Sequence, residues 1–346
     1  MEIGKISIII IITLISCKSD PATQNHKDTF STDKLDIKAY NLISPEVAHE
    51  WIIEKPEVYI PIQVSKEKNF NSEHIPKAQN IWRPDYGSDT SKPYGGLIPS
   101  KEKLEHLLQI LGYEEGKTLL LYDIKANVDA MRFAWVLNLY GFDNFKIING
   151  GLSYWKKQDL PTTNEKAPII AKSNYQLEDN FDHSIIANFE EVLAAIQDTN
   201  TLLLDTRENY EYLGQAFVDK SEVLPCKKGA FNRGSIPSAI HLNWSSLVDL
   251  NGDHRIKSEK DLRYNLAQKG ITSDKKIILY CQSGSRTCHT FYVLKHVLAY
   301  QNVKNYDGSW IEWSYKNSID NEIPIEQLTT DIGFKILQDS LIKSLN

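Results

Sequence analysis

Apolar and polar positions along the chain repeat the same pattern twice. Each copy opens with a capped, helix-like segment, marked by Ser44-Pro45 in the first copy and by Asn188 in the second. A short apolar run that predicts a buried strand follows, Val58 to Val64 in the first copy and Thr201 to Leu204 in the second. Alternating strands and helices with short loops predict mainly parallel sheets covered by helices on both faces.

Three later motifs recur at a nearly constant spacing. The second-copy positions follow those of the first by 161, 158 and 157 residues, for Ile75 and Ile236, Asp123 and Cys281, and Gly151 and Gly308. A nearly fixed offset over this length indicates a duplicated structural unit. We therefore expect two domains of the same fold, joined by a connector over residues 161–180 that is rich in Pro, Thr, Asn, Lys and Ser.

The N-terminal segment has a different pattern. Residues 6–15 are almost wholly apolar, and the run ends in Leu14-Ile15-Ser16-Cys17, which resembles a bacterial lipobox. About ten apolar residues are too few to cross a bilayer core of about 30 Å. We expect a lipoprotein signal peptide over residues 1–17, with Cys17 lipidated, followed by a polar tether over residues 18–36. The alternative is an ordinary secretory signal in which Cys17 is incidental. The lipobox predicts an exported, lipid-anchored protein of the cell envelope, facing the periplasm or in the outer membrane.

Composition limits the classes of function. The chain of 346 residues is 41% hydrophobic and 24% charged, which fits a soluble globular protein of two domains. Its formal net charge of -6 argues against nucleic acid as a partner. Besides Cys17, three cysteines remain, and an odd number in an exported protein leaves a candidate reactive thiol: Cys226, Cys281 and Cys288. The sequence leaves open a disulfide between Cys226 and Cys288.

The segment around Cys281 carries the candidate chemistry. Cys281 ends an apolar run that begins at Lys276, and a helix is predicted from Thr287 to Tyr300. A cysteine between a strand and a helix N-terminus receives backbone N–H groups and the positive end of the helix dipole, which favour the thiolate. Mostly small residues in the loop let its amides converge on whatever the sulfur carries: Gln282, Ser283, Gly284 and Ser285. Arg286 either attracts an anionic substrate or braces the loop by pairing with a carboxylate. The alternative is a buried strand-end cysteine before an ordinary turn.

The first copy lacks this chemistry. Asp123 stands in place of Cys281, and the loop that follows has neither the glycine nor the arginine of the second copy. We therefore predict that the second copy is catalytic and that the first is structural and walls one side of the site.

With these features the chain resembles the tandem-domain rhodanese family of thiosulfate and 3-mercaptopyruvate sulfurtransferases. The resemblance covers about residues 37 to 325 and rests on four motifs: Cys281-Gln-Ser-Gly-Ser-Arg286-Thr287, Asp205-Thr206-Arg207-Glu208, Gly234-Ser-Ile-Pro237 and Asp307-Gly308-Ser309-Trp310. It implies an α/β protein of two rhodanese-like domains, each a mainly parallel sheet of about five strands flanked by helices. We expect the domains over residues 37–160 and 181–330, with a C-terminal tail over residues 331–346.

The resemblance also implies a reaction. Cys281 would attack the outer sulfur of a small anionic donor and become a persulfide, from which cyanide or a thiol collects the sulfur. Residues 282–286 would hold the transferred sulfur, and Arg207 would hold the donor unless it pairs with Asp205 or Glu208. No metal or organic cofactor is implied. We expect a monomer that meets the membrane only through its N-terminal lipid.

The donor and the class of activity have alternatives. We favour thiosulfate over 3-mercaptopyruvate, because Glu211 stands where mercaptopyruvate enzymes present a second arginine. Cysteine-based phosphatases have one more residue between cysteine and arginine than the four here, Gln282 to Ser285, which disfavours that class. A binding lipoprotein without turnover is the remaining alternative, against which the second copy keeps cysteine, glycine and arginine together.

Overall fold

The computed structural model describes residues 41–345 apart from 89–91 and 220–221. The predicted signal peptide with Cys17, the predicted tether over 18–36 and the first residues of the predicted first domain therefore lie outside the described residues. Within the part of the chain that is described, no helix is both long enough and apolar enough to cross a membrane.

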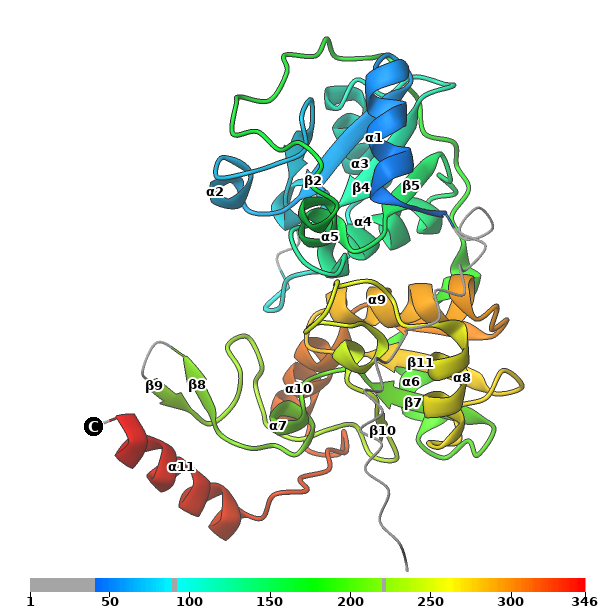
Figure 1. Ribbon diagram of the computed structural model, residues 1–346. Helices are drawn as coiled ribbons and strands as arrows, with labels where there is room; N and C mark the ends of the chain where they lie inside the picture. The colour runs from blue at the N-terminus through cyan, green and yellow to red at the C-terminus, as the bar shows by residue number, and fades with distance from the viewer. Residues whose placement is uncertain (1–40, 89–91, 220–221, 346) are drawn as a thin grey trace, which may run out of the picture. The chain divides into compact units, whose positions relative to one another are not determined.

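The first copy forms a five-stranded sheet in which all the paired strands are parallel. The strand order is β1-β5-β4-β2-β3, and β2, β4 and β5 are labelled in Figure 1. The strands are β1 (Leu42–Ile43), β2 (Tyr59–Val64), β3 (Gln79–Ile81), β4 (Thr118–Tyr122) and β5 (Phe145–Ile148).

The second copy repeats this topology in a second parallel sheet, with strand order β10-β7-β11-β12-β6. The strands are β6 (Ile186–Ala187), β7 (Thr201–Asp205), β10 (Ile240–His241), β11 (Lys276–Tyr280) and β12 (Val303–Tyr306). The predicted fold class, two parallel five-stranded sheets flanked by helices, is confirmed. An antiparallel hairpin of β8 (Phe217–Asp219) and β9 (Glu222–Leu224) lies between β7 and β10 and was not expected.

Helices connect the strands in both copies. In the first copy they are α1 (Pro45–Glu54), α2 (Glu67–Phe70), η2 (Arg83–Tyr86), α3 (Lys101–Ile110), α4 (Val128–Leu139) and α5 (Gly151–Lys157). In the second copy they are η3 (His183–Ile185), α6 (Phe189–Ala195), α7 (Asn209–Tyr212), η4 (Trp244–Leu247), α8 (Glu259–Ala267), α9 (Ser285–Tyr292), η5 (Val293–Val297) and α10 (Ser309–Ile319), before the C-terminal α11 (Asp331–Leu345).

Local sequence signals explain several helix ends. Ser44 accepts a hydrogen bond from Val47 N at the start of α1, and Asn188 forms a capping box with Glu191 at the start of α6. The helix expected from Thr287 to Tyr300 begins earlier, at Ser285, and its α-helical part ends at Tyr292. A π-helical turn, η5, continues it, and Ala299, with a φ of 58°, follows the end of that turn.

Alternating side chains of the central strands separate the core into layers. In β4, Leu119 and Leu121 pack with α3 and α4, whereas Leu120 and Tyr122 face α1 and α5. In β11, Ile277 and Leu279 join the first of these clusters, together with residues of α8 and α9. One apolar cluster thus contains residues of both copies, and α4 packs against its sequence equivalent α9.

The duplication extends to a buried tyrosine at the end of each central strand. Tyr122 Oη accepts a hydrogen bond from Ile75 N at 3.0 Å, and Tyr280 Oη accepts one from Ile236 N at 3.1 Å. Each phenol therefore satisfies the backbone donor of the Ile-Pro motif, which lies in a buried turn.

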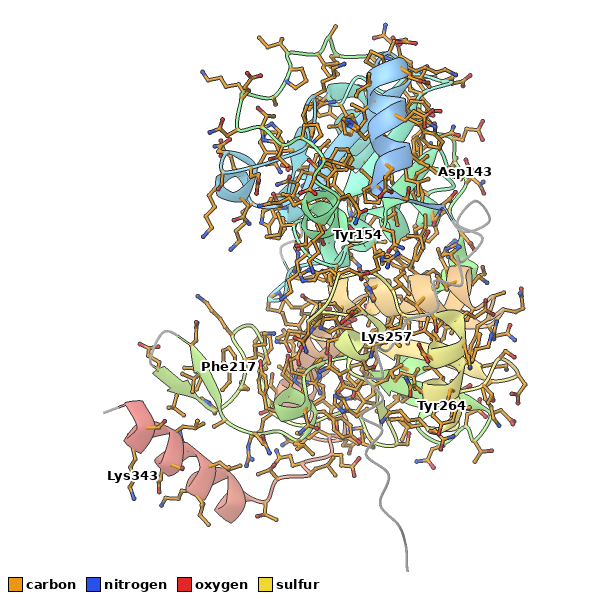
Figure 2. The ribbon with its side chains drawn as sticks, viewed as in Figure 1. Asp143, Tyr154, Phe217, Lys257, Tyr264 and Lys343 are labelled. Carbon is orange, nitrogen blue, oxygen red and sulfur yellow. The ribbon has the colours of Figure 1, made fainter. Side chains whose placement is uncertain are left out.

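Replacing Tyr122 by Phe should lower the free energy of unfolding by about 1–3 kcal/mol, because it leaves the buried Ile75 N–H without an acceptor. Urea denaturation followed by circular dichroism measures the change. The control is Tyr264→Phe on the exposed face of α8 (Figure 2), which should leave the unfolding transition unchanged. Equal stability of the two variants would show that the buried hydrogen bond contributes little.

Candidate functional site

Cys281 lies at the carboxyl end of β11, directly before the loop that leads into α9. Cys281 is 1% exposed. The loop turns at Gly284, whose φ is 80°, and a Cβ there would lie 2.9 Å from Arg132 Nη1 and 3.1 Å from Asp307 O. Any residue with a Cβ would be strained by the left-handed conformation and would contact these atoms too closely, so this position requires glycine.

Backbone amides and one guanidinium act on the Cys281 thiol. Burial raises its pKa, but the charge of Arg286 and the N–H groups of Thr287, Ser283 and Arg286 outweigh burial, so the net pKa is lowered. Thr287 Oγ1 lies 3.9 Å from Sγ. The loop therefore favours a thiolate, the form in which a cysteine is a nucleophile.

The first copy builds the same cradle around a carboxyl group. Asp123 Oδ1 accepts hydrogen bonds from Lys125 N at 2.7 Å and Asn127 N at 2.9 Å, and Oδ2 accepts one from Asp129 N at 2.9 Å. Lys125 and Asp129 precede Ser283 and Thr287 by the same 158 residues that separate Asp123 from Cys281. Burial and the charge of Asp129 raise the pKa of Asp123 to about 7, while the three N–H donors favour its ionised form. The first copy thus fills its cradle with its own side chain.

Arg286 is held by a buried carboxylate. Its Nη1 and Nη2 lie 2.5 Å and 2.9 Å from Glu211 Oε2 and Oε1. Burial of Glu211 raises its pKa, but the bond to Arg286 and the charges of Arg286, Lys227 and Arg207 lower it to about 2. The sequence left two roles open for Arg286, and in the structure it pairs with a carboxylate. The same guanidinium also lowers the pKa of Cys281.

Arg207 is also committed to a carboxylate. Its Nε lies 2.9 Å from Asp205 Oδ1, its Nη2 lies 2.5 Å from Oδ2, and Nη2 also donates to Gly234 O at 2.7 Å. The residue is 1% exposed, and its guanidinium lies 4.6 Å from the ring centroid of Trp310. The ion pair with Asp205 is thus present, and a role of Arg207 in holding the donor stays a prediction.

The Asp-Gly-Ser-Trp motif, at the N-terminus of α10, forms hydrogen bonds with the backbone of the loop. Ser309 Oγ accepts from Cys281 N at 3.2 Å, and Trp310 N donates to Cys281 O at 2.9 Å. Ile311 N donates to Gln282 O at 3.1 Å. The first copy uses the equivalent bond, from Leu152 N to Asp123 O at 2.8 Å. The motif therefore serves the loop backbone, and its Trp310 is buried.

Residues of the first copy reach the loop after Cys281, and the sequence analysis, which expected that copy to wall one side of the site, did not identify them. Arg132 of α4 lies with Nη1 2.6 Å from Asp307 Oδ1 and 3.5 Å from Gly284 O, in a buried ion pair. Ile98 N donates to the other oxygen of Asp307 at 2.8 Å, and a Cβ on Gly96 would lie 3.3 Å from Ser283 Cβ. An arginine flanked by Met131 and Phe133 in a mainly apolar helix was the available signal.

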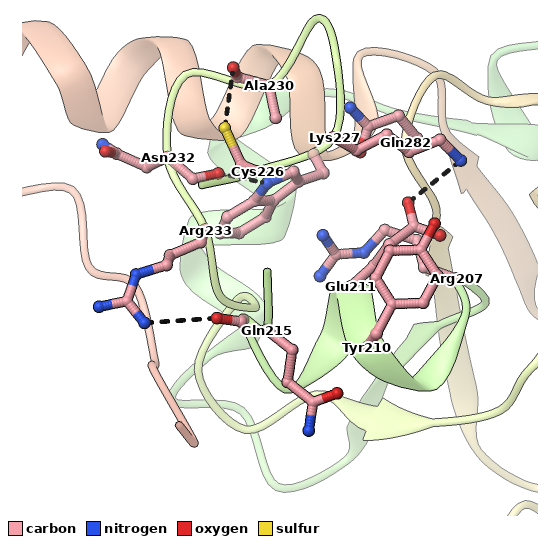
Figure 3. Close-up of a pocket in the computed structure, with 12 residues that line it drawn as sticks. Arg207, Tyr210, Glu211, Gln215, Cys226, Lys227, Ala230, Asn232, Arg233 and Gln282 are labelled. Carbon is pink, nitrogen blue, oxygen red and sulfur yellow. Dashed lines mark hydrogen bonds and ion pairs between the residues drawn. The ribbon is translucent and has the colours of Figure 1, made fainter. Parts of the chain in front are cut away.

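The three described cysteines are free thiols with different surroundings. Burial raises the pKa of Cys288 to about 12, although Arg132 opposes it, and its Sγ donates to Gly284 O at 2.9 Å. Cys226 is half-buried and donates to Ala230 O at 3.4 Å in a pocket beside the loop (Figure 3). Among the described residues, no three His, Cys, Asp or Glu side chains gather to hold a metal ion.

The fold and this loop define a duplicated α/β protein in which one of the described thiols, that of Cys281, has a lowered pKa. Comparison with known proteins agrees with this fold. The family model described as "Rhodanese-like domain" matches residues 44–158 and 188–316. The chain therefore belongs to the rhodanese family.

Named relatives place it among the sulfurtransferases of that family. The chain is 32% identical over 275 residues to "Sulfur carrier protein TtuD" of Thermus thermophilus, covering 77% of this chain and 92% of the relative. It is 32% identical over 241 residues to "Thiosulfate sulfurtransferase" of Corynebacterium glutamicum, covering 69% and 76%. A solved structure of the anaerobic ergothioneine biosynthesis enzyme from Chlorobium limicola shares the fold, with a TM-score of 0.67, 21% identity and coverage of 84% and 71%. The chain is a rhodanese-type sulfurtransferase.

Replacing Arg286 by Gln should raise the pKa of Cys281, because a positive charge that favours the thiolate is removed. The ultraviolet absorbance of the thiolate, measured against Cys281→Ser as background, should then appear at higher pH than in the unmodified protein. Arg263→Gln on α8, whose side chain is 45% exposed, is the matched control and should leave the midpoint unchanged. An unchanged midpoint in the Arg286 variant would mean that the amides alone set this pKa.

Proposed function

We propose that this sulfurtransferase moves the outer sulfur of thiosulfate to a thiophilic acceptor through a persulfide on Cys281. The observation that carries the proposal is the buried Cys281 thiol, with its lowered pKa, inside a ring of backbone N–H donors. The same ring in the first copy already holds the carboxyl oxygens of Asp123, which supports its use as a site for a charged group.

The two half-reactions balance without an added oxidant or reductant. The Cys281 thiolate attacks the outer sulfur of thiosulfate, a new S–S bond forms, and the bond to the inner sulfur breaks, so that sulfite leaves with the electron pair. Cyanide carbon or an acceptor thiolate then attacks the terminal sulfur of the persulfide. The S–S bond breaks toward Cys281, which returns to the thiolate, and thiocyanate or a new persulfide departs.

The loop residues would stabilise the terminal sulfur between these steps. Backbone N–H groups of Ser283, Arg286 and Thr287 already act on the thiol, and they lie on both sides of Gly284 and Ser285. Preorganised donors of this kind stabilise a charge that grows during a reaction more than they stabilise the neutral reactant. No general base is required if the nucleophile is already ionised.

Thiosulfate is favoured as the donor by the name of the Corynebacterium relative and by Glu211. Glu211 is a carboxylate that engages Arg286, so this position offers no cation to the carboxylate of 3-mercaptopyruvate. 3-Mercaptopyruvate remains the alternative donor. Turnover of the two donors by the purified protein, with cyanide as the common acceptor, compares them directly.

Cys281→Ser should abolish sulfur transfer, because it removes the nucleophile, whereas Cys226→Ser and Cys288→Ser should retain most of it. Intact mass after incubation with thiosulfate should show one added sulfur atom in every form except Cys281→Ser. Equal loss in all three variants would show that the wrong thiol was assigned. A protein that turns over no donor and gains no sulfur would instead be a binding lipoprotein.

For localisation we propose that Cys17 carries the lipid, on the strength of the Leu14-Ile15-Ser16-Cys17 sequence. Cells expressing the full chain should incorporate labelled palmitate into it, and Cys17→Ala should prevent this. Cys226→Ala is the matched control and should keep the label. Labelling that persists without Cys17 would overturn the lipobox assignment.

A further inference from the structure

A narrow pocket opens beside the catalytic loop (Figure 3). Its lining comes from α7, from the segment after β9, from the loop itself and from α10, and includes Glu211, Cys226, Lys227, Arg233, Gln282 and Trp310. The pocket is small and partly open to solvent. Gln282, one of the lining residues, follows Cys281 directly in the chain, although Cys281 itself does not line the pocket.

Lys227 is a cation of this pocket that is held by a long ion pair. Its Nζ lies 3.5 Å from Glu211 Oε1, but Arg286 already binds both oxygens of that carboxylate at 2.5 Å and 2.9 Å. The Lys227 side chain is 33% exposed, so it can turn toward a ligand. By contrast, Arg233 donates to Gly214 O and Thr329 O, and Arg207 is held by Asp205.

The Cys281 thiolate acts electrostatically on Lys227. Burial and the charge of Arg286 lower the pKa of Lys227, whereas Glu211 and Cys281 raise it. The Lys227 ammonium and the Cys281 sulfur therefore lie within electrostatic reach of one another. An anion bound by Lys227 would therefore also lie within electrostatic reach of Cys281.

Gln282 supplies a second, independent sign of a ligand. The residue is 7% exposed, and neither its side-chain nitrogen nor its side-chain oxygen has a hydrogen-bond partner among the residues that the structure describes. A buried amide without partners is costly, so such groups are normally satisfied. The carboxamide belongs to the pocket lining, where its N–H groups can donate to an oxyanion.

We propose that Lys227 Nζ and the Gln282 carboxamide form an oxyanion site that binds the sulfonate end of the sulfur donor. A sulfonate offers three oxygens, enough for both donors, and leaves the outer sulfur free to point at Cys281. The inference rests on the proposed function and adds to it the residues that recognise the donor. Lys227 and Gln282 act on the substrate and not through the persulfide.

Binding without turnover tests the site. In a Cys281→Ser background, isothermal titration calorimetry measures the affinity for thiosulfate, and Lys227→Gln should weaken it about ten- to hundredfold, as expected for a lost charge-assisted hydrogen bond. Lys228→Gln makes the same charge change at the next residue, which is exposed and outside the pocket lining, and should have little effect. Lys227→Arg keeps the charge and should recover part of the affinity. In the active protein, Lys227→Gln should raise KM for thiosulfate more than it lowers kcat.

The outcomes separate this inference from the proposed function. Equal affinity of the Lys227→Gln and Lys228→Gln forms, or no measurable binding of thiosulfate to Cys281→Ser, would overturn the oxyanion site. The unmodified protein could still gain one sulfur atom from thiosulfate, and then the proposed function would stand alone. Conversely, Lys227-dependent binding without any gain of sulfur would support the site and contradict the proposed transfer.

Discussion

The buried ion pair between Arg132 and Asp307 is the interaction on which the site depends. Arg132 comes from the first copy and Asp307 from the second, and their side chains are 3% and 7% exposed. Removing one partner of such a pair leaves an uncompensated charge in the interior, which typically costs about 3–5 kcal/mol. Arg132 also lies beside Gly284 and the Cys288 thiol, so the shape of the loop after Cys281 depends on a residue of the copy that has no thiol.

The rest of the site follows from a strand end that meets a helix N-terminus. The amides of the loop converge because Gly284 adopts a left-handed conformation, and α10 holds the carbonyls of Cys281 and Gln282 from the other side. Two carboxylates then restrain the arginines, Glu211 for Arg286 and Asp205 for Arg207. In this arrangement the positive charges are fixed before any anion arrives, so little reorganisation is needed on binding.

Local features of the site could be predicted from sequence, whereas contacts between distant segments could not. The parallel strands, the caps at Ser44 and Asn188 and the position of Cys281 depend on short-range patterns, and they were expected. Whether Arg286 would attract a substrate or pair with a carboxylate could not be decided, because Glu211 lies 75 residues away. Arg132 and Lys227 were missed for the same reason. Neither residue belongs to a motif, and only folding brings each to the loop.

The Asp123 carboxyl group has a consequence for the stoichiometry of this duplicated chain. A group tethered within the loop competes with free ligands at an effective concentration of about millimolar or more, so dilute anions rarely displace it. In the first copy the backbone N–H groups of the loop therefore bind the Asp123 carboxyl group, whereas in the second copy the equivalent N–H groups act on the Cys281 thiol. Of the two equivalent loops, the one at Cys281 presents a thiol and the one at Asp123 does not.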